Sequence, residues 1–300
     1  MSAADLSVLH RPHDRLGRRR VVNRLMEVLA WLAAAVAVGI LGLVVWAVAS
    51  RGASQLNLDL ITKPQAVNEF TLHPVSQGLA NAFVGTFVIV AIATAMALPF
   101  GILVAIYVNE FAPKSVKNFL SPSLDILNGV PAIVIGIFVF GLLVVGHGQS
   151  GLAGSFALAV LMLPLVARAT IEVLALVPDS LREASLGLGV PRWRTTLGIV
   201  LPQTIGGILT GTVLAVARVA GETAPLLFTS SIVGNDVSWN PTQALQSVPV
   251  AIYELSESPD PADHARAWAA ALVLLLFILL TSLTARWLAN RSRKKIRRAG

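Results

Sequence analysis

The sequence predicts an all-α membrane protein with six transmembrane helices. Hydrophobic residues make up 55% of the 300 residues and charged residues only 13%, and the mean hydropathy is positive, a composition typical of integral membrane proteins. The apolar residues gather in six runs, each long enough to cross a hydrocarbon core of roughly 30 Å at about 1.5 Å per residue. Arginine and lysine gather almost entirely between or beyond these runs, where they anchor the topology of a membrane protein.

Each predicted span has a local signature. The first exceeds the roughly 7 to 15 apolar residues of a signal-peptide core, so we expect an uncleaved helix. Pro99 and Gly101 predict a kink in the second. Near the start of the third, Asn128 and Pro131 predict irregular backbone, which a membrane tolerates only where it is buried in protein or lines water. The expected spans are residues 28–50, 79–108, 123–146, about 152–170, 203–231 and 266–288.

The distribution of positive charge predicts the orientation. Of the 23 Lys and Arg residues, 19 fall on one side of the membrane, three on the other and one, Arg218, within a span. Because the positive side is cytoplasmic, we expect both termini in the cytoplasm, in basic tails at residues 1–27 and 289–300. The two long loops, 51–78 and 232–265, then face outward.

Several classes of protein are excluded by what the sequence lacks. It has no cysteine and only scattered histidines, so we expect no cysteine chemistry, no metal site and no cofactor. Its basic tails carry no interleaved aromatics, which argues against nucleic-acid binding. A GxxxxGK[ST] phosphate loop and an HExxH motif are absent, and one securely buried carboxylate is too few for an intramembrane aspartyl protease. We therefore expect no catalytic residues.

A polar, basic stretch at residues 179–202 interrupts the apolar runs. Pro178 favours a helix start, and Ser180 with Glu183 three residues later predicts a capping box. Gly187, Gly189 and Pro191 should end that helix. A second short helix is expected up to Pro202, at an angle to the first. The bent pair would form a projecting surface on which another protein could dock.

This stretch resembles the cytoplasmic EAA loop of ABC importer permeases, with serine in place of the second alanine. The resemblance implies a type I importer permease, with a core at residues 79–288 and a coupling loop at 172–202 that docks on a separate ATPase. The alternative is an ordinary capped turn between membrane helices. The matching residues are Glu183, Ala184, Ser185, Gly189, Ile199, Leu201 and Pro202.

Charge within the fifth span predicts a functional site. Arg218 and Glu222 each cost on the order of 3 kcal/mol at the bilayer centre, so they should face protein or water. Their four-residue spacing predicts one shared helix face. The alternative is a salt bridge that only locks the bundle. Arg168 and Glu172 repeat the spacing at the inner end of the fourth span, where a pathway role and simple anchoring are equally favoured.

Three segments resemble the PstA-type permeases of bacterial phosphate importers. They are ARVAGETAPLLF at residues 217–228, LNGVPAIVIGIFVFGLL at 127–143, which contains Asn128, and LPLVARATIEVLALVPDSLREASLGLG at 163–189. The resemblance implies that Arg218 binds phosphate as a two-pronged donor. Glu222 would hold that arginine or accept a hydrogen bond from a phosphate hydroxyl, and Asn128 would line the same pathway.

The same resemblance implies the protein's partners and location. These are a PstB-type ATPase dimer, a PstC-type sister permease and a PstS-type phosphate-binding protein, in the lipid of the bacterial cytoplasmic membrane. A permease for another oxyanion, sulfate or molybdate, is the nearest alternative. A regulatory membrane scaffold that transports nothing is a second.

Overall fold

The computed structural model describes residues 14–65, 78–231 and 237–299, and these are mostly helical. The chain forms two compact units, residues 1–50 and 51–300. The first unit contains most of α1 (Asp14–Gly52), a single helix long and apolar enough to cross a membrane. Parts of the predicted tails and outer loops, at residues 1–13, 66–77, 232–236 and 300, lie outside the described residues.

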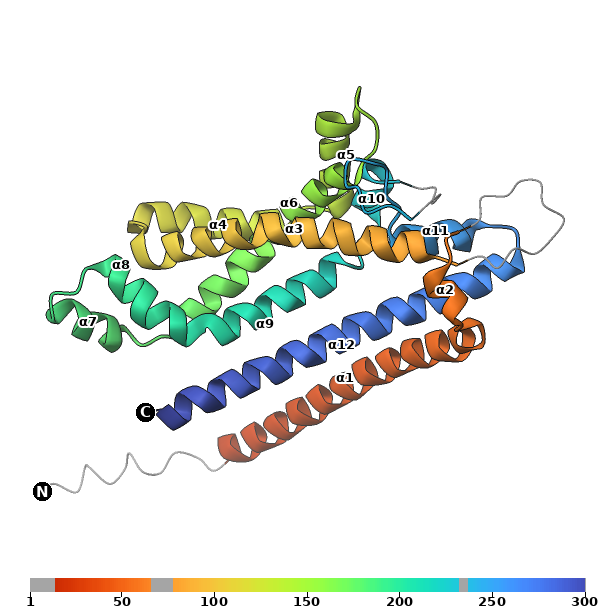
Figure 1. The fold of residues 1–300 in the computed structure, drawn as a ribbon. Helices are drawn as coiled ribbons and strands as arrows, with labels where there is room; N and C mark the ends of the chain where they lie inside the picture. Colours follow the sequence, from red (N-terminus) through yellow and green to blue (C-terminus); the bar gives the residue numbers. More distant parts are fainter. Residues whose placement is uncertain (1–13, 66–77, 232–236, 300) are drawn as a thin grey trace, which may run out of the picture. The chain divides into compact units, whose positions relative to one another are not determined.

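The second unit contains the remaining helices (Figure 1). Three π-helical turns, η4 (Tyr107–Phe111), η5 (Phe140–Val144) and η6 (Thr196–Val200), extend or join α-helices. A short 3₁₀ turn, η3 (Ala53–Gln55), follows α1. The α-helices are α2 (Leu58–Thr62), α3 (Ala80–Ile106), α4 (Lys114–Gly129), α5 (Ala132–Val139), α6 (Gly151–Leu174), α7 (Asp179–Gly187), α8 (Arg192–Thr195), α9 (Leu201–Val219), α10 (Ala224–Thr229), α11 (Val248–Glu257) and α12 (Pro261–Ala299).

Across the described residues, five helical segments could each cross a membrane, and the bent pair α4 and α5 with η5 makes a sixth. The pair bends by 92°, because Pro131 has no N–H to donate and holds Val130 in extended backbone. The predicted irregular backbone near Asn128 is therefore confirmed. The sequence was wrong about residues 114–121, predicted as loop, because α4 already begins at Lys114.

The fifth predicted span differs from the structure at both ends. Helix runs without a break from Arg192 through η6 to Val219, so the expected second short helix, separated from the span at Pro202, is wrong. The π turn η6 accommodates Pro202, which has no N–H to donate. Directly before this proline, the N–H of Leu201 donates to the carbonyl oxygen of Thr196, five residues earlier. At the other end the chain breaks after Val219 and restarts as α10.

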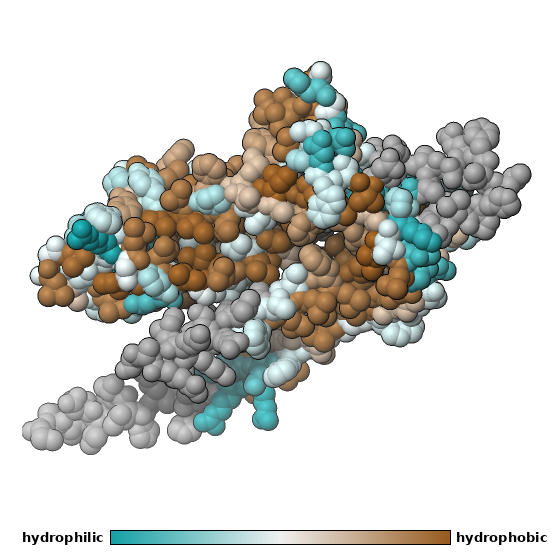
Figure 2. Space-filling view, viewed as in Figure 1, coloured by the Kyte–Doolittle hydropathy of each residue, from teal (hydrophilic) through white to brown (hydrophobic). Residues whose placement is uncertain are grey.

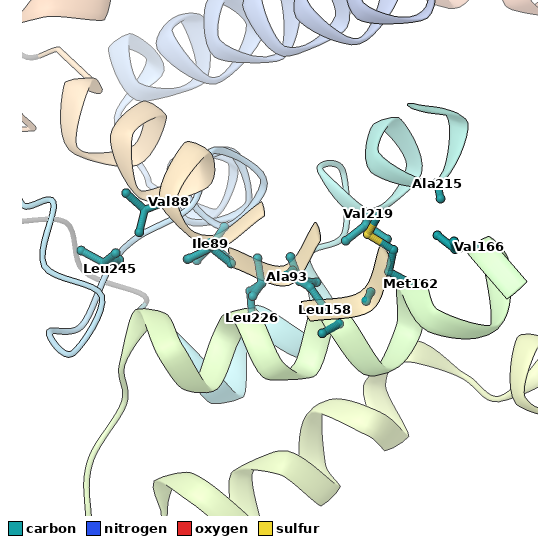
Figure 3. Close-up of a cluster of buried hydrophobic side chains, with 13 residues drawn as sticks. Val88, Ile89, Ala93, Leu158, Met162, Val166, Ala215, Val219, Leu226 and Leu245 are labelled. Atoms are coloured by element: carbon teal, nitrogen blue, oxygen red, sulfur yellow. The ribbon is translucent and has the colours of Figure 1, made fainter. Parts of the chain in front are cut away.

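The main core lies where α3, α6 and α9 meet. Figure 3 shows Ile89 and Ala93 of α3 pointing toward Leu158 and Met162 of α6, with Val219 of α9 beside them. Alanines on α3 keep its backbone close to α6, which allows a long contact between two helices. This core sets the position of the end of α9. α3 continues as one helix through Pro99, so any bend there stays within the helix.

Apolar side chains also cover much of the visible surface. Figure 2 shows them over α3, with hydrophilic residues near α7 at one end and near α11 at the other. Phe87, Phe100 and Phe119 are each more than 60% exposed. Large exposed aromatics are what a membrane-facing surface requires, so the apolar band agrees with a membrane protein.

A buried polar network fastens the segment before α11 onto α3. Asn81 Nδ2 donates to Gln246 Oε1 at 2.9 Å, and Gln246 Nε2 donates to Glu254 Oε2 at 2.6 Å. Val248 N–H donates to Thr86 Oγ1 at 2.8 Å. Burial raises the pKa of Glu254, with a smaller contribution from nearby Asp263 in the same direction.

Candidate functional site

Three of the predicted pathway residues line one small pocket. Asn128 at the end of α4, Arg218 in the last turn of α9 and Glu222 beyond it surround a cavity of about 50 Å³. A single water needs ~10–15 Å³ measured this way, so the space is on the order of four oxygen-sized groups. The apolar wall consists of Leu127, Val130, Ala132, Leu161, Leu165 and Val219.

Arg218 and Glu222 do not share a helix face, contrary to the spacing argument. α9 ends at Val219, Gly221 N–H donates to Arg218 O at 3.1 Å, and Glu222 lies in the turn before α10. The cause is local, because Pro225 suits the first turn of a new helix and cannot continue an old one. Within the described chain the two side chains make no ion pair with each other. The alternative reading, a salt bridge between them that only locks the bundle, is therefore not observed among the described residues, and both remain available to a ligand.

Asn128 brings an unsatisfied group to the same pocket. Its Oδ1 atom is buried and has no hydrogen-bond partner in the described chain. Leaving a buried acceptor unpaired costs about 1–3 kcal/mol, so such groups call for an explanation. A ligand in the pocket would supply one.

The pocket lies between two helix breaks, one separating α4 from α5 and the other α9 from α10. Helices α5 and α10 pack together (Figure 1), and a Cβ on Gly136 of α5 would lie 2.6 Å from Pro225 Cα of α10. Only glycine permits this approach. Broken helices of this kind are tolerated in membranes where the backbone is buried or lines a cavity.

Arg168 and Glu172 lie outside this pocket. Arg168 Nε is 3.5 Å from Glu172 Oε1 and 3.4 Å from Asp125 Oδ1 on α4. All three side chains are more than a third exposed, so these pairs contribute only about 0–1 kcal/mol each. Asp125 lies one helical turn before Asn128, so Arg168 contacts the helix that presents the pocket residue.

The stretch at 179–202 forms a short helix followed by a sharp turn. α7 begins one residue after Pro178, which occupies the N-cap, and no side chain caps it. The predicted capping box of Ser180 and Glu183 is therefore wrong, because the extended backbone imposed by Pro178 starts the helix two residues earlier than expected. Glu183 and Ala184 instead lie exposed on the helix surface.

The turn after α7 explains the glycine of the motif. Gly189 has φ +78°, Val190 N–H donates to Ser185 O at 3.2 Å and Gly189 N–H donates to Leu186 O at 2.9 Å. This is a Schellman motif, which needs a left-handed residue. Ser185 is buried and its hydroxyl lies 2.8 Å from Thr195 Oγ1 of α8, so the serine that departs from the motif joins the two helices. Of the motif's last residues, Ile199 and Leu201 are half-buried and Pro202 is exposed.

Arg182 fastens α7 to η4, the π turn that continues α3. Its Nε and Nη2 donate to the two carboxylate oxygens of Glu110 at 3.2 and 2.9 Å, and it also donates to the carbonyl oxygens of Val177 and Leu174 and to Asp179. The hydrogen bond to Glu110 is the largest of the effects that raise the pKa of Arg182. This two-pronged pair is largely buried, so it fixes the orientation of α7.

The comparisons with known proteins agree with this architecture. Residues 97–294 match the family profile "Binding-protein-dependent transport system inner membrane component". The chain is 38% identical over 275 residues to the phosphate transport system permease protein PstA of Haemophilus influenzae, covering 89% of this chain and 94% of that protein. Against PstA 1 of Mycobacterium tuberculosis it is 40% identical, covering 72% of each chain. The chain belongs to the PstA-type permeases of this family.

Solved structures show that the fold of this PstA-type permease is that of importer permeases. A bacterial alginate ABC transporter in complex with its pentasaccharide-bound periplasmic protein superposes with a TM-score of 0.60 at 13% identity, covering 93% of this chain and 96% of that one. The inward-facing MetNI methionine transporter gives 0.55 at 16% identity, covering 71% and 93%. At such low identity the likeness concerns the fold alone.

Sequence reasoning missed three features of this PstA-type permease. Glu110 pairs with Arg182, and Asp125 pairs with Arg168. From the sequence, Arg182 was interpreted only as a topology signal, and Arg168 only by its four-residue spacing from Glu172. A polar chamber of about 420 Å³ beside α7, lined by Lys117 and Arg192 among others, was also unforeseen. The available signal was a carboxylate at the end of an apolar run, which seldom occurs without a partner.

Proposed function

We propose that this chain is the permease subunit through which a bacterial ABC importer carries inorganic phosphate into the cytoplasm. The observation that carries the proposal is the pocket between the two helix breaks, where Arg218 forms no ion pair with another described residue. The relatives, phosphate transport system permease proteins, point to the same substrate.

The chemistry of the pocket suits a passing anion. The guanidinium of Arg218 would bind an oxyanion through two parallel N–H donors. Arg218 is exposed in the described chain, and an uncompensated cation on the pathway would hold an anion too tightly, because conduction requires binding weak enough to release. Glu222 on the same pocket reduces that attraction.

The energy for inward transport would come from a partner, since the chain has no phosphate loop. α7 and the turn at Gly189 would dock on a PstB-type ATPase dimer, and the Arg182–Glu110 pair would pass the motion to α3. A PstC-type sister permease would complete the pathway, and a PstS-type binding protein would deliver phosphate to the outer loops. Both termini would then lie in the cytoplasm of a bacterium, as the charge distribution predicts.

ATP-dependent uptake of phosphate and sulfate by the assembled complex in proteoliposomes tests the substrate. We expect Arg218→Ala to abolish phosphate uptake, and Arg51→Ala, which removes an exposed arginine away from the pocket, to leave it unchanged. Wild-type preference for sulfate would support the other-oxyanion alternative. Unchanged phosphate uptake in Arg218→Ala would remove Arg218 from the pathway.

Co-purification tests the coupling role. We expect Glu183→Ala combined with Gly189→Asp to prevent the ATPase dimer from co-purifying with the permease, because the first removes an exposed carboxylate from α7 and the second distorts its turn. Retention of the ATPase by this variant would contradict docking through α7. A wild-type chain that binds no ATPase would favour the regulatory-scaffold alternative.

A further inference from the structure

The pocket described above holds more acceptors than a site for a simple anion needs. Arg218 supplies donors, but Glu222 and the unpaired Oδ1 of Asn128 are both acceptors. A fully deprotonated oxyanion offers only acceptors, so it would leave Asn128 Oδ1 unpaired and place its charge against the Glu222 carboxylate. A ligand that both accepts and donates hydrogen bonds matches all three side chains.

Hydrogen phosphate has this mixed character at neutral pH. Its deprotonated oxygens accept from a guanidinium, while its P–OH group donates one hydrogen bond. Sulfate at the same pH has the same tetrahedral shape and no O–H. Of the two ions, only hydrogen phosphate can therefore donate a hydrogen bond to the unpaired Oδ1 of Asn128.

We propose that Asn128 is a specificity-determining residue of the permease, whose Oδ1 accepts a hydrogen bond from the P–OH group of a phosphate held by Arg218. This inference rests on the proposed function and deepens it, because it places discrimination between phosphate and sulfate inside the membrane subunit. Glu222 adds to the discrimination, because dihydrogen phosphate, the other main form at neutral pH, has a second P–OH group to donate to it, whereas sulfate has none.

The position of Asn128 fits this role. It is the penultimate residue of α4, directly before the break at Val130 and Pro131, so it comes to the pocket from a different helix than Arg218. Neither Arg218 nor Glu222 hydrogen-bonds to it in the described chain. Its acceptor is therefore held in place without being used.

The size of the effect follows from one hydrogen bond to a charged ligand. Such a bond is worth about 1.5–3 kcal/mol, which at 1.4 kcal/mol per factor of ten corresponds to about 10- to 100-fold in affinity. Fully enclosed sites that bind a hydroxyl reject analogues lacking it by about 10⁴-fold or more. We expect the lower range, because this pocket is small and partly open.

The natural absence of cysteine from this chain makes a direct probe possible. Val130→Cys places one thiol in the pocket wall, and its rate of maleimide labelling is measured in the permease complex without the binding protein. We expect inorganic phosphate to slow labelling and sulfate at equal ionic strength to do so only at about 10- to 100-fold higher concentration. Gly141→Cys, where a Cβ meets nothing within 4 Å, should be labelled at a rate that neither ion changes.

Two substitutions on the Val130→Cys background then assign the effect to Asn128. Asn128→Leu should raise the phosphate concentration needed for protection by about 10- to 100-fold and bring it close to that for sulfate. Asn128→Asp keeps an acceptor at the same place, so protection by phosphate should persist at low pH, where the ligand carries more protons, and weaken as pH rises. Equal protection by the two ions in the parent, or unchanged protection in Asn128→Leu, would overturn the inference.

The outcome also separates this inference from the proposed function. Loss of phosphate protection in Arg218→Ala together with normal discrimination in Asn128→Leu would leave the phosphate pathway intact and refute only the role of Asn128. No protection of the parent by phosphate would contradict both.

Discussion

Arg182 and Glu110, 72 residues apart in the sequence, form a two-pronged ion pair with Nη2 to Oε1 at 2.9 Å. Their side chains are only 17% and 8% exposed, so solvent screens this pair less than it screens an exposed pair. We expect Glu110→Gln to destabilise the attachment of α7 by about 1.5–3 kcal/mol, the range for a hydrogen bond to a charged group. Hydrogen exchange of residues 179–187 should speed up accordingly, and ATP hydrolysis should continue with less uptake per ATP.

Asp179 provides a matched control on the same guanidinium. It also accepts from Arg182, at 3.0 Å, but its side chain is 88% exposed, and exposed pairs contribute about 0–1 kcal/mol. Asp179→Asn should therefore change exchange and coupling little. Equal effects of the two substitutions would show that burial does not decide the strength of this attachment.

Gly136 should not tolerate a methyl group. A Cβ there would lie 2.6 Å from Pro225 Cα, and backbone cannot yield as a flexible side chain can. We expect Gly136→Ala to separate α5 from α10, to cost about 1–3 kcal/mol as other overpacked sites do, and to reduce phosphate uptake by distorting the pocket. Thermal unfolding of the purified complex measures the first effect. Gly141→Ala, which meets nothing within 4 Å, should leave both properties near wild type.

Two glycines at the end of α7 should respond to alanine with opposite signs. Gly187 is the last residue of α7 and an added Cβ meets nothing within 4 Å, whereas Gly189 has φ +78°. Alanine favours helix over glycine by up to about 1 kcal/mol, and a left-handed non-glycine residue costs about 1–2 kcal/mol. Gly187→Ala should thus slow hydrogen exchange in α7 and Gly189→Ala should speed it up. Faster hydrogen exchange of α7 in Gly187→Ala, without faster exchange in Gly189→Ala, would contradict the Schellman geometry.

The sequence predicted the fold well where the signal was periodic or compositional. It failed where contacts with other segments determine the local backbone. Six apolar runs predicted the spans, and Pro131 predicted the break between α4 and α5, because a missing N–H acts locally. The shared helix face of Arg218 and Glu222 was wrong, because Pro225 and a tertiary contact with Gly136 favour a new helix there.

For the candidate site, the sequence identified part of the residue set and not which charges pair. Of the five residues predicted to line the pathway, Asn128, Arg218 and Glu222 line one pocket, whereas Arg168 and Glu172 lie outside it. The partners of Arg182 and Arg168 come from other helices, so no spacing along the chain points to them. The capping box failed for a local reason, since Pro178 starts α7 before Ser180 is reached.

The half-buried carboxyl of Glu254 should make stability depend on pH. Burial raises the pKa of this residue above the ordinary 4.5, with Asp263 adding to the effect and the hydrogen bond from Gln246 opposing it. A carboxyl with a raised pKa binds its proton more tightly in the folded state than in the unfolded state. Its stabilising contribution is therefore fully present below pH 4.5 and is lost as pH rises through the folded pKa.

Thermal unfolding of the complex between pH 4 and 8 measures this loss. We expect Tm to fall as pH rises above about 4.5, the unfolded pKa, and Glu254→Gln to remove that part of the pH dependence, because a neutral amide keeps the shape without titrating. Glu257→Gln, an exposed carboxyl on the same helix, should keep the wild-type profile. Since Gln246 links Glu254 to Asn81 on α3, hydrogen exchange near residues 246–250 should follow the same pH course in the wild type. Identical profiles for wild type and Glu254→Gln would place the titrating group elsewhere.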